Sequence, residues 1–336
     1  MLQAQKRKWI GSGIFLALFL LIAANLSRIA PVDTFTYLHV SRLHSSFFSL
    51  FFRIITQLAS PAVMLLLCFV MVFTMQDKRY RIPLMLNIVL SALLNLALKD
   101  VFQRARPSDV LTLVQESGYS FPSGHSMAAT TFYGFLIFLL PRSGLSPARK
   151  KFFTYLLALC IPLVMLSRIY LGVHYFSDIL GGFLIAMVYL AVYTTLVEEY
   201  VKHPENEALT SFNEKKAPLF SSFSYAAEGI RAAFLQERNM VIHFAAMTTV
   251  TMLGLLLKLS KGEWIACLLL FGMVLMGELM NTAIETVVDI AMPDKDPRAK
   301  LAKDTAAGGV LIAAVIAAII GAIIFLPKIW TLLQTL

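Results

Sequence analysis

Three short segments of the chain carry the residue types that bind and transfer phosphoryl groups. They span residues 99–107, 121–126 and 167–178. Lys99, Arg106 and Arg168 supply fixed positive charges and hydrogen-bond donors for phosphoryl oxygens. Ser123 and Gly124 stand at the expected start of a helix, where backbone N–H groups and the helix dipole can hold an anion. Together the segments predict a phosphate-binding site.

Two histidines supply the remaining chemistry of this site. His174 and Asp178 are four residues apart, which on a helix places them on one face. The carboxylate can keep one imidazole nitrogen protonated and leave the other free to attack phosphorus. His125 is then available as the acid that protonates the leaving oxygen. Because a lone basic residue or histidine beside a membrane span is commonly structural, the prediction depends on the three segments occurring together.

A second group of polar residues lies within an apolar stretch. Glu278, Asn281, Glu285 and Asp289 fall within a stripe about 80° wide on a helix. Each ionisable group in a membrane helix costs about 2.5–3.5 kcal/mol, so these acids need a cation or a function. Carboxylates and an amide suit Mg²⁺, which prefers oxygen ligands and is commonly shared with phosphates. The alternatives are a buried polar network that fixes helix packing and the proton relay of a transporter.

The composition indicates that a membrane surrounds these residues. Of 336 residues, 58% are hydrophobic and 15% are charged, and the mean hydropathy is +0.73. A soluble domain carries about 25% charged residues, so the excess apolar surface must face lipid. We predict an all-α integral membrane protein with about nine spans: 9–26, 56–75, 83–101, 125–141, 153–172, 175–197, 240–258, 264–289 and 305–327. The net charge of +9 flanks these spans, so no nucleic-acid partner is expected.

A polar segment at residues 199–222 divides the chain. Its Pro, Glu, Lys, Ser and Asn residues cannot build a core, which predicts a cytoplasmic linker between domains 1–198 and 223–336. Lys and Arg are more frequent in the segments that are cytoplasmic when the N-terminus is inside. This bias predicts a multi-pass protein of the bacterial cell membrane, with the first site outside and the second site on the cytoplasmic side.

The first set of motifs resembles a family signature. The pattern K-x6-R-P, P-S-G-H and S-R-x5-H-x3-D is similar to that of the type 2 phosphatidic acid phosphatase superfamily over residues 1–198. The resemblance implies a six-helix membrane core and metal-independent hydrolysis through a phosphohistidine. It gives His174 the role of nucleophile, Asp178 that of its orienting residue and His125 that of the acid. It assigns phosphoryl binding to Lys99, Arg106, Ser123, Gly124 and Arg168.

The second set of motifs resembles the prokaryotic diacylglycerol kinase and undecaprenol kinase family over residues 215–327. The similar runs are A-x-E-G-I-R…Q-E-R-N-x-x-I-H, E-x-x-N-T-A-I-E-x3-D and A-K-D-x-A-A-G-x-V-L-I. The form around Glu237 is closer to the undecaprenol kinase branch. The resemblance implies a three-helix membrane domain that uses Mg²⁺ and ATP to phosphorylate a lipid alcohol. It also implies a homotrimer formed through this domain.

The kinase resemblance assigns roles to individual residues. Glu278 would take the proton of the lipid hydroxyl, and Glu237 and Glu285 would hold Mg²⁺ with the nucleotide phosphates. The remaining polar positions of the nucleotide site would be filled by Asn281, Asp289, Lys303 and Asp304.

The two resemblances together predict a bifunctional membrane enzyme that acts on lipid phosphates and lipid alcohols. If the phosphatase converts undecaprenyl diphosphate to the monophosphate and the kinase phosphorylates undecaprenol, the two reactions give one product. The alternatives are a phosphatidylglycerophosphate or phosphatidic acid phosphatase joined to a diacylglycerol kinase, and a non-catalytic membrane transporter.

Overall fold

The computed structural model describes residues 2–108, 110–202 and 219–334. Over these ranges the secondary structure is helical, with no strand. The chain divides into two compact units, Met1–Lys202 and His203–Leu336. Most of the predicted linker, from 203 to 218, lies outside the described residues. Its described ends, 199–202 and 219–222, belong to helices.

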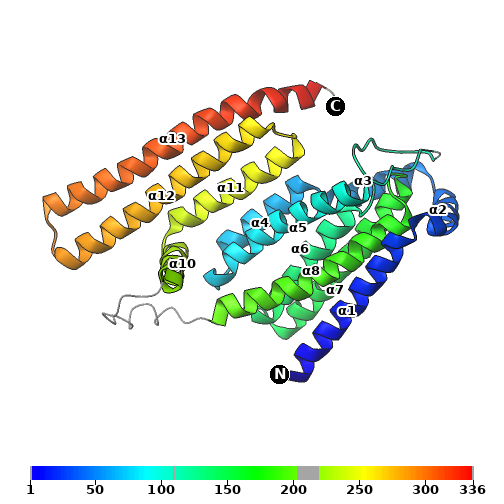
Figure 1. The fold of residues 1–336 in the computed structure, drawn as a ribbon, viewed down its shortest axis with the longest axis horizontal. Coiled ribbons are helices and arrows are strands. Elements are labelled where there is room, and N and C mark those ends of the chain that lie inside the picture. The colour runs from blue at the N-terminus through cyan, green and yellow to red at the C-terminus, as the bar shows by residue number, and fades with distance from the viewer. Residues whose placement is uncertain (1, 109, 203–218, 335–336) are drawn as a thin grey trace. The chain divides into compact units, whose positions relative to one another are not determined.

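The first unit is a helical bundle in which α8 packs against α1 and α6 (Figure 1). In chain order its α-helices are α1 (Leu2–Ala24), α2 (Leu26–Ser41), α3 (Ser46–Gln57), α4 (Pro61–Thr74), α5 (Arg81–Phe102), α6 (Gly124–Leu139), α7 (Pro147–Tyr170) and α8 (Phe176–Lys202). The 3-10 turns η1 (Lys78–Tyr80) and η2 (Leu140–Arg142) precede α5 and follow α6. Because α6 also packs against α5 and α7, it holds the bundle together from within.

Glycines allow α8 to approach the turn that precedes α6. A Cβ at Gly181 would lie 2.5 Å from the Phe121 ring, and one at Gly182 would lie 2.7 Å from the backbone oxygen of Ser123. Any larger residue would force the helix away. The ring of Phe121 is fully buried in an apolar cluster that includes Phe19 of α1. Close packing here fixes the start of α6 against the start of α8.

The predicted spans differ from the helices at two places. Seven helices of the described chain are long and apolar enough to cross a membrane. The predicted span 56–75 is interrupted, because Ser60 caps α4 and Pro61 begins it, and α3 and α4 meet at 49°. The predicted span 125–141 is the 16-residue helix α6, which at 1.5 Å per residue is about 24 Å long. Counting about nine spans therefore requires the bent pair and the short α6 to be included.

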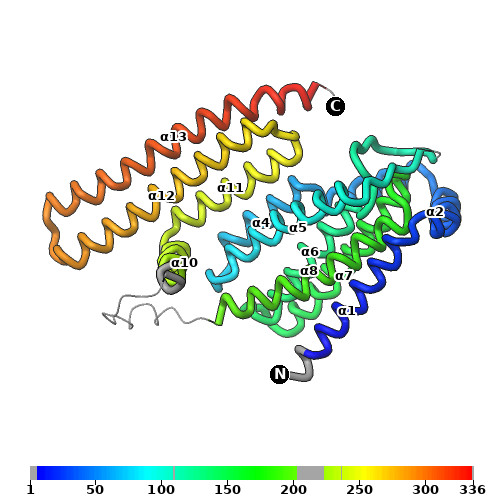
Figure 2. The backbone as a smooth tube through the Cα atoms, in the orientation of Figure 1, coloured from blue at the N-terminus to red at the C-terminus, as the bar shows by residue number. Residues whose placement is uncertain are grey.

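The described part of the second unit, residues 219–334, contains four helices. They are α10 (Leu219–Gln236), α11 (Arg238–Leu256), α12 (Lys261–Ala291) and α13 (Pro297–Gln334). Figure 2 shows α12 and α13 as a long hairpin with α11 beside α12, and α12 packs against both neighbours. Ser260 and Glu263 form a capping box that starts α12. Leu259, Cys267 and Phe325 form a buried cluster at this end of the hairpin.

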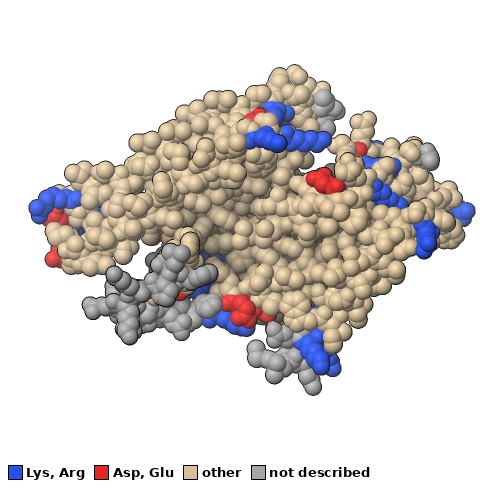
Figure 3. Space-filling model, in the orientation of Figure 1, with Lys and Arg blue, Asp and Glu red and all other residues tan. Residues whose placement is uncertain are grey.

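The surface of each unit is suited to lipid. Large apolar side chains are exposed along α1, α4, α12 and α13, and in the face shown in Figure 3 charged residues lie mainly near helix ends. A water-soluble protein rarely exposes Leu, Ile and Phe side chains over so much of its surface. The prediction of an all-α integral membrane protein is confirmed.

Candidate active sites

The residues predicted to bind phosphate come together at one end of the first unit. Lys99 lies at the end of α5, Arg106 in the loop that follows, and Arg168 near the end of α7. Ser123 caps the start of α6, and His174 lies in the short turn between α7 and α8. Helix ends from three segments that are far apart in sequence therefore build one site.

The contacts of His174 determine which of its ring nitrogens is free. Its Nδ1 lies 3.3 Å from Asp178 Oδ2, and its Nε2 lies 3.2 Å from Nη1 of Arg106. A guanidinium can only donate, so Nε2 must be the accepting nitrogen and Nδ1 must carry the proton. The Nε2 lone pair is the nucleophilic one in this arrangement.

The surroundings of His174 keep its ring neutral. The side chain is buried. Burial, together with the positive charges of Arg168, Arg106 and Lys99, holds the pKa of the His174 imidazole well below its ordinary value. A neutral imidazole is the form that can attack phosphorus.

A further layer of residues, absent from our sequence prediction, holds Asp178. Arg104 Nη1 donates to Asp178 Oδ1 at 2.6 Å, and Arg104 Nη2 donates to Asp33 Oδ2 at 2.8 Å. Asp33 also accepts from the backbone N–H and the hydroxyl of Ser177. Both carboxylates are almost fully buried. Arg104 stands between Lys99 and Arg106 in sequence and could have been noticed, whereas Asp33, in α2, gives no local signal.

The three predicted cations are each held by the chain. Arg168 is almost fully buried, and its Nη1 donates to Thr56 Oγ1 at 2.8 Å. Arg106 donates to the backbone oxygens of Val173, Gly118 and Ser117. Lys99 Nζ donates to the backbone oxygen of Tyr119 at 2.8 Å. The site is therefore preorganised for an anion.

One acidic residue that the sequence prediction did not include lies among these cations. Glu116 Oε1 accepts from Arg168 Nη2, and Glu116 Oε2 lies 3.6 Å from Arg106 Nη2. Burial alone would raise the pKa of the Glu116 carboxyl, but Arg168 and Arg106 outweigh that effect and lower it. Glu116 is therefore a carboxylate at neutral pH.

The start of α6 contributes the remaining predicted residues. Ser123 Oγ accepts from the backbone N–H of Ser126, and the Ser123 N–H donates to the backbone oxygen of Asp178. A Cβ at Gly124 would lie 3.0 Å from Asn95 Oδ1, so the helix starts in a tight space. His125 follows. Arg168, His174, Lys99 and Arg106 all lie close enough to interact electrostatically with its ring. All eight predicted phosphatase residues thus belong to one end of the bundle.

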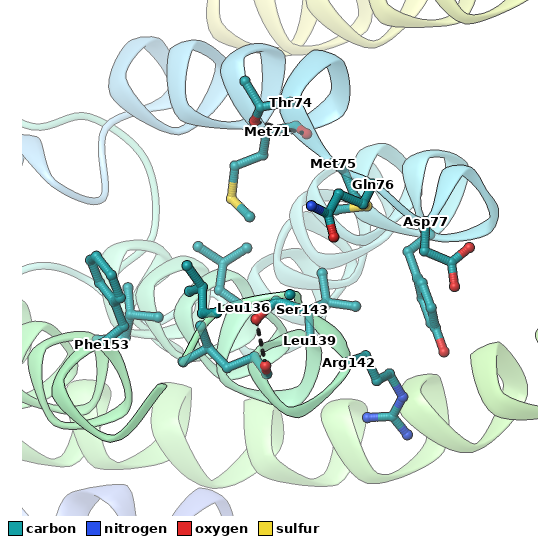
Figure 4. A pocket seen from close by; sticks show the side chains of 15 residues that line it. Met71, Thr74, Met75, Gln76, Asp77, Leu136, Leu139, Arg142, Ser143 and Phe153 are labelled. Carbon is teal, nitrogen blue, oxygen red and sulfur yellow. Dashed lines mark hydrogen bonds between the residues drawn. The ribbon is translucent and has the colours of Figure 1, made fainter. Parts of the chain in front are cut away.

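A cavity lies at the opposite ends of these helices. Its volume is about 490 Å³, and it is lined by the ends of α4 and α6 and the start of α7. In Figure 4, apolar side chains such as Leu136 and Phe153 form its wall, while Asp77 and Arg142 lie at its edge. None of the predicted phosphatase residues lines it. This cavity therefore does not mark the predicted phosphatase site.

The second predicted site surrounds Glu278 of α12. This side chain is 1% exposed, and neither carboxylate oxygen has a hydrogen-bond partner among the described residues. His243 Nε2 of α11 lies 4.0 Å from Glu278 Oε2. Glu278 and Asn281 line a pocket of about 230 Å³ between α11, α12 and α13. A buried carboxylate that opens onto a pocket is suited to receive a proton from a bound hydroxyl.

The other predicted kinase residues lie along α12 and at the starts of α11 and α13. Asn281 Nδ2 donates to Glu285 Oε1 at 3.1 Å, while Asn281 Oδ1 is buried without a partner in the described chain. Asp289 pairs with Lys303, and Asp304 is exposed. Glu237 stands at the N-cap position of α11 without a capping hydrogen bond from its side chain, and the charges of Glu237 and Glu285 both act on Glu278. The predicted residues therefore share one end of the unit.

The described residues contain no group of three or more His, Cys, Asp or Glu side chains arranged to hold a metal ion. Mg²⁺ commonly binds through one or two carboxylates together with substrate phosphates. The oxygen donors of Glu285 and Asn281 fit such a site, because one amide oxygen there is buried and unpaired.

Curated relatives match each unit separately. Residues of the chain are 47% identical over 110 residues to "Undecaprenol kinase" of Bacillus subtilis, which is 33% of this chain and 89% of that protein. They are 43% identical over 97 residues to "Phosphatidylglycerophosphatase B" of Bacillus subtilis, 29% of this chain and 47% of that protein. A third relative, "Diacylglycerol kinase" of Synechocystis, is 39% identical over 116 residues, 34% of this chain and 66% of that protein.

Structure and family comparisons agree with this division. The crystal structure of the PAP2-type phosphatidylglycerolphosphate phosphatase of Bacillus subtilis superposes with a TM-score of 0.53 at 28% identity, covering 56% of this chain and 96% of that one. The PAP2 superfamily model matches residues 81–202, and the prokaryotic diacylglycerol kinase model matches residues 224–325. The chain therefore belongs to the PAP2 superfamily through its first unit and to the prokaryotic diacylglycerol kinase family through its second, which makes it a membrane lipid phosphatase joined to a lipid kinase.

Proposed function

We propose that the first unit removes phosphate from a lipid through a phosphohistidine at His174. The observation that carries the proposal is the pair of contacts on its ring, Asp178 at Nδ1 and Arg106 at Nε2. The Nε2 lone pair attacks phosphorus, and the bond between phosphorus and the leaving oxygen breaks with its electron pair on that oxygen. His125 gives this oxygen a proton.

The second half of the reaction restores the enzyme. Water attacks the phosphorus held on His174 and loses a proton to His125, and the P–N bond breaks with its electrons returning to Nε2. Lys99, Arg106 and Arg168 balance the charge of the phosphoryl oxygens throughout. Asp178, held by Arg104, keeps the imidazole in the reactive orientation.

We propose that the second unit transfers the γ-phosphoryl group of ATP to a lipid alcohol. Glu278 accepts the hydroxyl proton as the lipid oxygen forms its bond to phosphorus, and ADP leaves with the electron pair. Glu285 and Glu237 would hold Mg²⁺, which when bound neutralises the charge of the nucleotide phosphates. Asn281, Asp289, Lys303 and Asp304 complete the polar lining of the nucleotide site.

The relatives favour particular lipids. Undecaprenol is the proposed kinase substrate, because the protein named undecaprenol kinase is matched over 89% of its length. Undecaprenyl diphosphate is the proposed phosphatase substrate, since both reactions then yield undecaprenyl phosphate. Phosphatidylglycerophosphate is the second candidate, because the phosphatase relative carries that activity in its name.

We also propose an arrangement in the membrane. The N-terminus is cytoplasmic, the phosphatase site faces outside and the kinase site faces the cytoplasm, as the distribution of Lys and Arg predicts. The kinase unit assembles as a homotrimer. A membrane-impermeant thiol reagent tests the orientation on cysteines placed at Ser108 and Asp296 in a background without the three native cysteines. Labelling of both positions from one side contradicts it.

A panel of lipids tests the substrates. Purified full-length protein should release phosphate from undecaprenyl diphosphate without ATP, and should phosphorylate undecaprenol only with Mg²⁺ and ATP. Preference for phosphatidylglycerophosphate over undecaprenyl diphosphate would replace the first candidate by the second. No turnover of any lipid phosphate or lipid alcohol would contradict both assignments.

A further inference from the structure

The guanidinium groups proposed to bind the phosphoryl group already hold a carboxylate of the same chain. Glu116, in the loop between α5 and α6, pairs with Arg168 and approaches Arg106 to 3.6 Å. Arg106 at the same time covers the nucleophilic Nε2 of His174. A phosphoryl group that binds both arginines and reaches this nitrogen must take the place of the Glu116 carboxylate.

The partners of the two arginines do not depend on Glu116. Arg168 keeps its bond to Thr56 Oγ1, and its Nε is buried with no partner among the described residues. Arg106 keeps three backbone oxygens as acceptors. Both guanidinium groups can therefore keep these anchors when the carboxylate leaves, although Arg106 Nη1 must give up His174 Nε2 before that nitrogen can attack phosphorus.

The Glu116 side chain is anchored less firmly than the arginines. It is 29% exposed, whereas the Arg168 side chain is 1% exposed. In the described chain its carboxylate hydrogen bonds and ion pairs are with Arg168 and Arg106. Displacement therefore moves the Glu116 carboxylate from a partly exposed position into solvent.

We propose that Glu116 is a specificity-determining residue of the phosphatase site, an internal anion that the phosphoryl group of the substrate must displace. This inference depends on the proposed function of the first unit. Glu116 carries one negative charge and two oxygens, whereas a terminal phosphate carries about two negative charges and three oxygens at neutral pH. The exchange therefore favours monoesters and diphosphates and disfavours phosphodiesters, which carry a single charge. In a membrane rich in phosphodiester lipids, this competition keeps their headgroups out of the site.

The test is competition by inorganic phosphate, measured with purified full-length protein and a short-chain phosphatidic acid as substrate. Glu116→Gln keeps the size of the side chain and removes its charge. The inhibition constant of phosphate should fall by roughly tenfold or more, the factor that corresponds to one charge-assisted hydrogen bond. The KM of the substrate should fall with it. Glu116→Asp should give a smaller decrease in both values.

Glu198→Gln is the matched control. Glu198 also accepts from an arginine, with its Oε1 2.8 Å from Nη2 of Arg142, but this pair lies at the opposite ends of the helices. The control should leave both constants unchanged, and thermal unfolding of each variant shows that it is folded. An unchanged or increased inhibition constant in Glu116→Gln overturns the inference, since Glu116 would then only hold the arginines in place.

Failure of the proposed phosphatase function can be told apart from failure of the role of Glu116. If the first unit is not a phosphatase, the wild-type protein releases no phosphate from any lipid phosphate. Calorimetric binding of inorganic phosphate needs no turnover, so it still tests the inference. Tighter binding by Glu116→Gln than by the wild type supports the role of Glu116, and equal or weaker binding overturns it.

Discussion

The two sites differ in how completely one chain builds them. In the phosphatase site, His174, Asp178 and the three cations all have partners, and Arg104 and Asp33 form a further layer behind them. In the kinase site, the buried Glu278 carboxylate has no hydrogen bond in the described chain, and Asn281 keeps an unpaired oxygen. Buried polar atoms without partners are costly. Arg168 Nε is also buried without a partner in the described chain, but each charged residue of the first site is held by at least one other contact, so that site is preorganised. The Glu278 carboxylate of the second site has no such hydrogen bond.

The largest expected effect is the loss of the phosphatase nucleophile. His174→Ala should reduce phosphate release by at least roughly four orders of magnitude, because no other group is placed to form the covalent intermediate. ATP-dependent lipid phosphorylation, measured on the same sample, should be unchanged and serves as the control. Phosphate release at a rate near that of the wild type would remove His174 from the mechanism.

Replacement of Glu278 should produce the opposite pattern. Glu278→Gln is nearly isosteric and should lower kinase kcat by roughly 10²–10⁴-fold, the contribution typical of a general base. Phosphate release and nucleotide binding should persist. Because the change removes a buried charge whose ion pair with His243 is long, at 4.0 Å, the thermal stability should be equal or higher. Near-normal lipid phosphorylation in this variant would make Glu278 a structural residue.

A smaller effect distinguishes the metal ligand from the base. Glu285→Gln should raise the Mg²⁺ concentration needed for half-maximal kinase rate by roughly tenfold, since a metal ligand acts before chemistry begins. Glu278→Gln should not change that concentration. A shift of equal size in both variants would show that the two carboxylates act as one unit.

The pH dependence of phosphate release should show the smallest effect. The pKa of His174 lies well below 6.5 because of burial and the neighbouring cations. As the pH falls, the ring stays neutral until the pH approaches that lowered pKa. The acid limb of kcat/KM should therefore lie below pH 6.5. A limb at or above pH 6.5 would mean that the site does not hold His174 neutral.

The sequence predicted the helices better than the contacts between them. Long apolar runs located the helices that can cross the membrane. The break at Ser60 and Pro61 and the short helix α6 depend on local helix-start and helix-end signals inside such runs. His174 and Asp178 do come together, but not on one helix face as the spacing predicted, because His174 lies in the turn before α8 and Asp178 in the first turn of that helix.

The residues that sequence reasoning missed act across long separations. Asp33 reaches Arg104 from 71 positions away, and Glu116 reaches Arg168 from 52 positions away. Such pairs follow from how α2 and the loop between α5 and α6 fold back on the bundle, and no local pattern carries that information. The stripe on α12 was visible in the sequence, but the burial of Glu278 beside His243 depends on the packing of α11.

The contrast between a preorganised and an incomplete site is tested most directly by a chelator. Both activities are measured in one preparation of the full-length protein, with and without EDTA. Phosphate release should be unchanged, because Lys99, Arg106 and Arg168 supply the positive charge, and ATP-dependent lipid phosphorylation should fall to background. Loss of both activities, or survival of both, would contradict the account.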